Sequence, residues 1–305
     1  MKIFITGSSG FIGQHLVPLL RQQHTIIELQ SDLRNHTDVV NELVAADPDV
    51  IVHLAARTEV EKSFYEQVTF SEINYVGSVN LIDAACRLRN LKNFVFASTM
   101  EVYGWQPISD EVRDHGQPQV SLAFDEHTPP NPNAPYAVAK LAVEKYLEYA
   151  HRSLNLPFTA IRQTNSYGRS DNDFFVTEQI ITQMLKNANE INLGYAEPFR
   201  NFIWIDDLLE AWKRVIENPD LCNQGRIYTV GPDRPIRISD YAHKIANMLD
   251  WHGHINWNTK PKRPGEIYWL NSGNQAISQD LGWAPKIDLD TGLAKTIDIW
   301  RRLIK

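Results

Sequence analysis

The sequence predicts an α/β protein in which a doubly wound, mostly parallel sheet is followed by a smaller C-terminal α/β lobe. Short apolar runs and helical segments alternate through the first half of the 305-residue chain, as they do where crossover helices join parallel strands. A glycine-rich turn separates the first apolar run from the first helical segment. After residue 165 the alternation weakens and Trp and Pro become frequent, which indicates a second, smaller unit.

The individual elements are predicted from the spacing of their apolar residues. Short runs rich in aliphatic and β-branched residues predict buried strands. These runs lie at residues 2–6, 25–30, 50–54, 94–98 and 158–162. Segments whose apolar residues recur every three or four positions predict helices. These segments lie at residues 11–22, 38–46, 72–90 and 136–153.

A polar, proline-rich stretch at residues 106–133 interrupts the alternation. A loop of this length inside a compact domain is usually functional or disordered. Ligands of doubly wound sheets bind at the carboxyl ends of the strands. We therefore expect this stretch to form part of the rim or lid of a substrate cleft there.

The glycine-rich turn reads Gly7-Ser8-Ser9-Gly10-Phe11-Ile12-Gly13 and lies between a strand and a helix. Glycine permits positive φ and close backbone approach, and the start of a helix offers free N–H groups to a pyrophosphate. The strand–turn–helix context distinguishes a dinucleotide fingerprint from a chance match. We therefore predict that Gly7, Gly10, Phe11, Ile12 and Gly13 bind a dinucleotide. The alternative is a tight turn that needs glycine for steric reasons alone.

Tyr136 and Lys140 are four residues apart and therefore share one face of the helix expected at 136–153. A free tyrosine titrates near pH 10, but a neighbouring ammonium stabilises the phenolate and lowers that pKa. Together with the dinucleotide turn, the pair predicts hydride transfer between a nicotinamide and an alcohol or ketone. The alternative is an ordinary amphipathic helix with a half-buried tyrosine and a solvated lysine.

Composition narrows the remaining classes of function. A net charge of −7 argues against a nucleic-acid partner, which needs a basic stripe. The chain has neither a run of 18 apolar residues nor a basic and apolar leader, so no membrane segment is expected. Two cysteines, Cys86 and Cys222, favour a reducing, cytoplasmic environment. The histidines lack metal-ligand spacing, so no metal is expected.

The two motifs and several later segments resemble the extended short-chain dehydrogenase/reductase family, in its NAD-dependent epimerase/dehydratase branch that modifies sugar nucleotides. The resemblance covers essentially the whole chain. It implies a Rossmann-type domain over residues 1–165, to which residues 199–221 return, and a substrate lobe formed by residues 166–198 and 222–305. It also implies a nucleoside-diphosphate sugar as substrate, NAD or NADP as cofactor, and a homodimer.

The resemblance assigns further residues to the cofactor and the substrate. Asp32 and Leu33 resemble the acidic and apolar pair that holds the adenine amino group. Residues 49–56 resemble the strand whose end, at Leu54, Ala55 and Ala56, lies over the cofactor. Three residues resemble those that bind the nucleoside diphosphate, namely Asn165, Arg200 and Arg263.

The same resemblance divides the possible reactions at Thr99 and Glu101. Thr99 is expected to hydrogen-bond the reacting sugar oxygen that Tyr136 protonates or deprotonates. In 4,6-dehydratases a glutamate at the position of Glu101 removes a sugar proton, but here Met100 replaces the acid between them, and a thioether cannot protonate a leaving hydroxyl. An epimerase is therefore favoured, then a 4-keto reductase, then a 4,6-dehydratase in which Glu101 acts as base and acid.

Two alternatives remain beside this interpretation. Glu101 could merely cap the following loop, which would make it a structural residue. The whole chain could be a non-catalytic dinucleotide-binding or redox-sensing protein on the same fold, since a fold does not guarantee activity. Such proteins usually lose the tyrosine or the lysine, whereas this chain keeps both.

The choice between NAD and NADP depends on the end of the second strand. That position usually carries an acid that binds the adenosine ribose diol and repels a 2′-phosphate. Here it is Gln30, with Ser31 and Arg34 close by. The sequence alone therefore leaves NADP at least as plausible as NAD.

Overall fold

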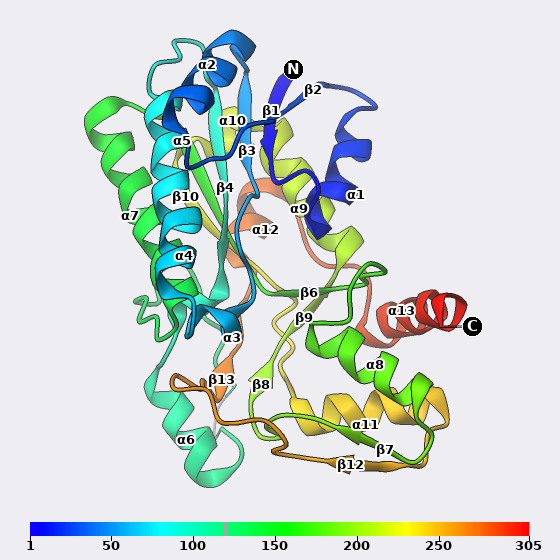
Figure 1. Ribbon diagram of the computed structural model, residues 1–305. Coiled ribbons are helices and arrows are strands. Elements are labelled where there is room, and N and C mark those ends of the chain that lie inside the picture. The colour runs from blue at the N-terminus through cyan, green and yellow to red at the C-terminus, as the bar shows by residue number, and fades with distance from the viewer. Residues whose placement is uncertain (119–120, 305) are drawn as a thin grey trace.

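The computed structural model describes residues 1–118 and 121–304. At its centre is a parallel sheet with the strand order β10-β5-β4-β3-β1-β2 (Figure 1). Its strands are β1 (Lys2–Thr6), β2 (Thr25–Glu28), β3 (Val50–His53), β4 (Asn93–Thr99), β5 (Phe158–Gln163) and β10 (Gln224–Val230). The predicted doubly wound α/β fold is thus confirmed.

Helices cover both faces of this sheet because alternate strand residues point to opposite sides. Ile3 and Ile5 face a core shared with α1 and α9, whereas Phe4 faces a second core shared with α2, α5 and α7. The helices of the first face are α1 (Phe11–Leu20) and α9 (Ile205–Glu217). Those of the second face are α2 (His36–Ala46), α5 (Gly77–Ala85) and α7 (Pro135–Leu154).

The helix expected at 72–90 begins earlier and ends sooner. Three contiguous pieces form it, namely α4 (Gln67–Ser71), the π-helical turn η1 (Glu72–Val76) and α5. Within the π turn, the side chain of Asn74 is buried and binds both backbone groups of Arg57, at 2.8 and 2.9 Å. The irregular turn therefore anchors the loop that follows β3.

The second lobe lies below the carboxyl ends of the central strands in Figure 1. Its small sheets pair β7 with β12, β8 with β11 and β13, and β6 with β9. Their bounds are β6 (Asn165–Tyr167), β7 (Glu190–Asn192), β8 (Phe199–Arg200), β9 (Phe202–Trp204), β11 (Ile236–Arg237), β12 (His254–Asn256) and β13 (Trp269–Leu270). The longer helices of this lobe are α8 (Val176–Lys186), α11 (Ile238–Leu249) and α13 (Leu289–Leu303).

The chain crosses between the two lobes more often than the sequence suggests. Within residues 199–221, helix α9 returns to the central sheet and packs beside α1. β10 is the edge strand of that sheet, although we expected all of residues 222–305 in the substrate lobe. Helix α12 (Gln275–Leu281) packs against both β10 and α9. The boundary therefore has to be corrected for these elements.

The stretch 106–133 also differs from the expected open loop. It contains helix α6 (Pro107–His115), and Phe124 forms a β-bridge with Ser272. Buried Val112 and Phe124 pack with the apolar residues of β13. None of its described residues lines the large cavity at the strand ends, so in this structure they support β13 rather than cover a cleft. Residues 119–120 lie outside the described part of the chain.

Candidate active site

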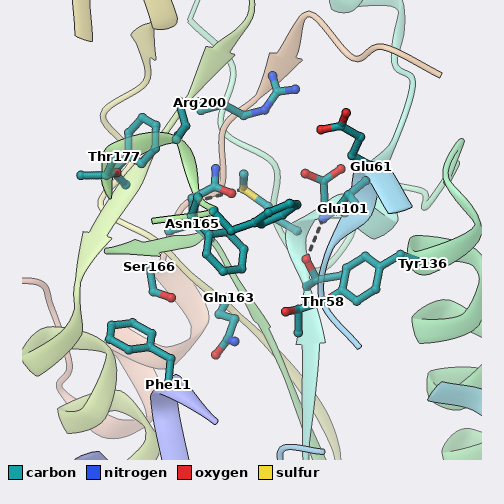
Figure 2. A pocket seen from close by; sticks show the side chains of 18 of the residues that line it. Phe11, Thr58, Glu61, Glu101, Tyr136, Gln163, Asn165, Ser166, Thr177 and Arg200 are labelled. Atoms are coloured by element: carbon teal, nitrogen blue, oxygen red, sulfur yellow. Dashed lines mark hydrogen bonds between the residues drawn. The ribbon is translucent and has the colours of Figure 1, made fainter. Parts of the chain in front are cut away.

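A cavity of about 530 Å³ opens at the carboxyl ends of the central strands and extends into the second lobe (Figure 2). It brings together residues that the sequence places up to 259 positions apart, from Gly7 to Glu266. The predicted site residues that line it are Gly7, Gly10, Phe11, Ile12, Gly13, Leu54, Ala56, Thr99, Glu101, Tyr136, Lys140, Asn165, Arg200 and Arg263. Four predicted residues do not line it, namely Gln30, Asp32, Leu33 and Ala55.

The helix N-terminus that follows the glycine turn faces this cavity and has no side-chain cap. Helix α1 begins after Gly10 with no side-chain cap, so its first N–H groups are available to an anion. A Cβ at Gly7 would lie 2.5 Å from the Ala55 nitrogen, and one at Gly13 would lie 2.4 Å from the Gly7 oxygen. A Cβ at Gly10 would meet only one atom, at 3.4 Å. The fold itself thus requires Gly7 and Gly13, whereas Gly10 keeps the outer surface of the turn open.

Thr99, Glu101 and Tyr136 meet on one side of the cavity. Thr99 ends β4, and its Oγ1 accepts a hydrogen bond from the backbone N–H of Glu101 at 3.2 Å. Burial and the charge of Glu101 raise the pKa of Tyr136 well above the usual value, while the neighbouring Thr99 opposes the rise. Figure 2 shows Glu101 and Tyr136 reaching into the same space. In the free chain Tyr136 is therefore a neutral phenol, which can donate its proton.

Lys140 lies one turn beyond Tyr136 and is almost completely buried. Its Nζ donates a hydrogen bond to the carbonyl oxygen of Ala97 at 2.8 Å and lies 4.8 Å from the centre of the Phe96 ring. Burial lowers the pKa of Lys140 to about 7, while the nearby Glu144 opposes this shift. We expected Lys140 to lower the pKa of Tyr136. In this structure burial and the charge of Glu101 raise that pKa instead, and Lys140 is not among the groups that shift it.

A buried ion pair between Arg162 and Glu144 lies near Lys140. Arg162 holds Glu144 through two hydrogen bonds, at 2.7 and 3.0 Å, and both side chains are almost inaccessible to solvent. The hydroxyl of Ser98 also donates to Glu144. These contacts join α7 to β4 and β5, so they fix the helix that carries Tyr136 against the sheet.

Met100 cannot replace a catalytic acid at this position. It is 1% exposed, and its sulfur lies 3.0 Å from the Oγ1 of Thr164, itself hydrogen-bonded to the backbone oxygen of Asn201. A thioether sulfur is a weak acceptor and has no proton to give. Within η2 (Met100–Tyr103) only Glu101 therefore offers a carboxyl group to the cavity.

Two arginines, Arg200 and Arg263, line the cavity together with the carboxylates of Glu101 and Glu266. The Arg200 side chain is 11% exposed, and its Nη2 lies 3.4 Å from the Oε1 of Glu266. Burial lowers the pKa of Arg200, while Glu101 and Glu266 oppose that shift. Burial raises the pKa of Glu101, and the charges of Arg200 and Arg263 oppose the rise. Guanidinium groups so placed suit phosphate oxygens. Asn165, on β6, lines the same cavity as Arg200 (Figure 2).

The four predicted residues outside the cavity have other partners. Asp32 forms an ion pair with Arg34, which lowers the pKa of Asp32 to about 2. Leu33 is buried in the core beneath α2 and α5. The backbone N–H of Ala55 lies 3.3 Å from the Oγ1 of Thr6, and the Nε2 of Gln30 donates to the backbone oxygen of Glu28. No contact in this structure tests their expected cofactor roles.

The structure adds lining residues that the sequence did not identify. Thr58 and Glu61 follow β3, which ends at this edge of the sheet. The rule that ligands bind at the carboxyl ends of strands could have found them. Other additions come from the substrate lobe, where no local pattern marks them, namely Phe174, Phe175, Thr177, Leu193, Tyr195 and Lys260.

Arg169 connects the two lobes across the cavity wall. Its guanidinium carbon lies 4.1 Å from the centre of the Phe11 ring and 3.9 Å from that of Phe175. Phe11 begins α1 beside the glycine turn, and Phe175 precedes α8 of the substrate lobe. The cation–π contacts therefore tie the dinucleotide turn to the second lobe.

Among the residues that the structure describes, no group of three or more His, Cys, Asp or Glu side chains could hold a metal ion. Over the same residues, no helix is both long and apolar enough to span a bilayer.

The glycine turn and the Thr99–Tyr136–Lys140 group define a nicotinamide-dinucleotide-dependent enzyme of the extended short-chain dehydrogenase type. The sequence pattern of the NAD dependent epimerase/dehydratase family matches residues 3–231. The chain belongs to this family. Relatives by sequence carry the names of sugar-nucleotide dehydratases, epimerases and reductases.

Three comparisons give the range of this similarity. The chain is 30% identical over 274 residues to the dTDP-D-glucose 4,6-dehydratase of Dictyostelium discoideum. This alignment covers 81% of this chain and 62% of the length of that protein. The UDP-glucose 4-epimerase of Thermus thermophilus, solved with NAD, superposes with a TM-score of 0.86, 24% identity and 99% coverage of both chains. RMD from Pseudomonas aeruginosa, solved with NADPH, superposes with a TM-score of 0.84 and 25% identity, and the match covers 99% of both chains.

Proposed function

We propose that the protein acts on a nucleotide-activated hexose by hydride transfer at C4, and that its reaction is an epimerisation. The observation that carries the proposal is that Thr99, Tyr136 and Lys140 line one cavity, to which η2 contributes a single acid, Glu101. The names of relatives, which include 4-epimerases, support this class of substrate.

The proposed chemistry uses the residues at the end of β4 and on α7. The glycine turn would hold a nicotinamide dinucleotide, which would supply the hydride chemistry. Thr99 would orient the sugar hydroxyl, and Tyr136, in its phenolate form, would accept the hydroxyl proton during oxidation and return it during reduction. Lys140, held by the Ala97 carbonyl oxygen, supplies positive charge that stabilises the phenolate once ligands replace water.

The diphosphate of the substrate would bind the arginines on the far side of the cavity. Arg200 and Arg263 can each donate to phosphate oxygens, and Asn165 lines the same cavity. Because burial opposes a bare charge, an anionic ligand next to Arg200 relieves an electrostatic cost that the free chain carries. This arrangement supports a nucleoside-diphosphate sugar over a neutral sugar.

A 4,6-dehydratase reaction, which would remove the C6 hydroxyl of the sugar as water, is less well supported by the residues of the cavity. Elimination needs a base at C5 and a proton donor at the leaving hydroxyl, and buried Met100 can be neither. Glu101 would then have to serve as both base and acid, because burial raises its pKa but η2 supplies no second carboxyl group. Glu101 is better suited to hold a sugar hydroxyl by a hydrogen bond. A 4-keto reductase remains the second candidate, because it needs only the hydride and the proton of Tyr136.

Product analysis tests the proposal. UDP-, dTDP- and GDP-hexoses are offered with NAD, and matching 4-keto-6-deoxy sugars with NADH or NADPH. We expect a C4 epimer of at least one hexose without loss of water. A 4-keto-6-deoxy product from a hexose would mean that Glu101 serves as both base and acid. Reduction of the keto sugars without any epimerisation would replace the epimerase with the reductase, and no turnover of either set would overturn both.

A further inference from the structure

The end of β2 lies beside the dinucleotide turn, because β1 and β2 are parallel neighbours. Ile5 of β1 pairs with Glu28 of β2, and the next residue of β2, Leu29, donates its backbone N–H to the Ile5 oxygen at 2.9 Å. Gln30 and Ser31 therefore follow at the same edge of the sheet as Gly7. In dinucleotide-binding folds this strand end meets the adenosine ribose.

A carboxylate occupies this strand end although no acid follows β2 in the sequence. Glu42 reaches back from α2, and its Oε2 accepts the backbone N–H of Gln30 while its Oε1 accepts that of Ser31, both at 2.9 Å. Both carboxylate oxygens are thereby held in place. Within the described residues, no lysine or arginine pairs with Glu42 to neutralise it.

Of the two groups that could attract a 2′-phosphate, Arg34 is paired with Asp32 and the Ser31 hydroxyl is buried. Arg34 donates its Nε to both oxygens of Asp32, at 3.0 and 3.2 Å, and its Nη2 to Oδ2 at 2.5 Å. The Oγ of Ser31 is buried, so it does not face a ligand at the surface. The fixed charge nearest to the two N–H groups is therefore the negative one of Glu42.

We infer that Glu42 is the residue that makes this protein select NAD over NADP. The inference rests on the proposed function, because it assumes that a nicotinamide dinucleotide binds the glycine turn. A 2′-phosphate carries a charge of about −2 at neutral pH, and it would have to approach the Glu42 carboxylate. The backbone N–H groups of Gln30 and Ser31 could otherwise bind an anion. They already donate to Glu42 and are therefore not available to the 2′-phosphate.

Direct binding measurements test the inference independently of any sugar. Purified chain freed of bound nucleotide is titrated with NAD and with NADP, for the wild type, Glu42→Gln and Glu42→Ala. We expect the wild type to bind NAD at least tenfold more tightly, which corresponds to about 1.4 kcal/mol. Glu42→Gln should reduce this ratio by removing the charge. Glu42→Ala should reduce it further, because it also frees both N–H groups.

The matched control is Glu210→Gln, which removes the same charge from α9, where Glu210 pairs with Arg214. Its NAD-to-NADP ratio should equal that of the wild type. Added salt should lower the wild-type ratio more than that of Glu42→Ala, since screening weakens the repulsion.

The outcomes separate this inference from the proposed function. If NAD binds but NADP binds within tenfold, or if both Glu42 variants keep the wild-type ratio, the role of Glu42 is wrong and the proposed function stands. If neither dinucleotide binds, the proposed function fails together with the inference. If the ratio changes as expected while no sugar nucleotide reacts, the inference stands and the proposed reaction fails.

Discussion

The ammonium group of Lys140 lies 2.8 Å from the carbonyl oxygen of Ala97, so the end of β4 positions the lysine before any ligand binds. Burial lowers the pKa of Lys140 to about 7, so a substantial fraction is uncharged near neutral pH. Binding of anionic ligands would favour the charged form. Lys140 is thus preorganised in place while its charge can respond to the ligand.

The first prediction concerns the phenol of Tyr136. Tyr136→Phe should lower turnover by about 10²–10⁴-fold, the usual contribution of a general acid or base, with nearly unchanged cofactor binding. Lys140→Ala should weaken both turnover and cofactor binding. Steady-state kinetics and dinucleotide titration measure the two effects. Tyr149→Phe, an exposed position on the same helix, is the control. Retention of more than about a tenth of the activity in Tyr136→Phe would remove Tyr136 from proton transfer.

The second prediction concerns a buried histidine beneath the cofactor turn. Nδ1 of His53 lies 2.7 Å from Thr6 Oγ1, and its Nε2 lies 2.8 Å from Ser78 Oγ. Ser78 donates its own proton to the Asn74 oxygen, so Nε2 carries the ring proton and the ring is neutral. Burial, helped by the charge of Lys140, lowers the pKa of His53 to about 3.

This shift makes folding sensitive to acid. The unfolded chain takes up the proton near the ordinary pKa of 6.5, whereas the folded chain resists it until about 3. Stability from the neutral ring is therefore complete above pH 6.5 and is lost as the pH falls toward 3. Between pH 7 and 5 the loss is on the order of 2 kcal/mol. Denaturant unfolding at several pH values should show a shallower pH dependence in His53→Gln, but not in the exposed control His127→Gln. Equal slopes in all three proteins would contradict the assignment.

The third prediction is a homodimer through the face formed by α4, η1 and α7, which lie on one side of the molecule in Figure 1. Large apolar side chains are exposed on these elements or directly before α4, and exposed apolar surface of this kind favours association. They are Tyr65, Val68, Val76, Val138 and Tyr149. Light scattering should give a dimer at micromolar concentration. Val138→Lys should yield monomers, whereas Val44→Lys, equally exposed on α2, should not. A wild-type monomer would refute the prediction.

Much of the fold could be predicted because its signals are local. The strand–turn–helix at residues 2–20 and the helix that carries Tyr136 and Lys140 each follow from apolar spacing over a few residues. The continuous helix over 67–85 was placed only approximately, since a π turn and the anchoring of Arg57 by Asn74 leave no periodic mark. Helix α6 was missed because a polar, proline-rich segment resembles a loop until it packs against β13.

The sequence by itself determined which residues are candidates for the chemistry, because glycine, tyrosine and lysine have properties that act at fixed local spacings. Only the tertiary structure decided what surrounds them. It buried Tyr136 and thereby raised its pKa, brought Glu266 to Arg200, and returned Glu42 to the end of β2. Burial and contacts between distant segments depend on how whole elements pack, and no short stretch of sequence encodes that packing.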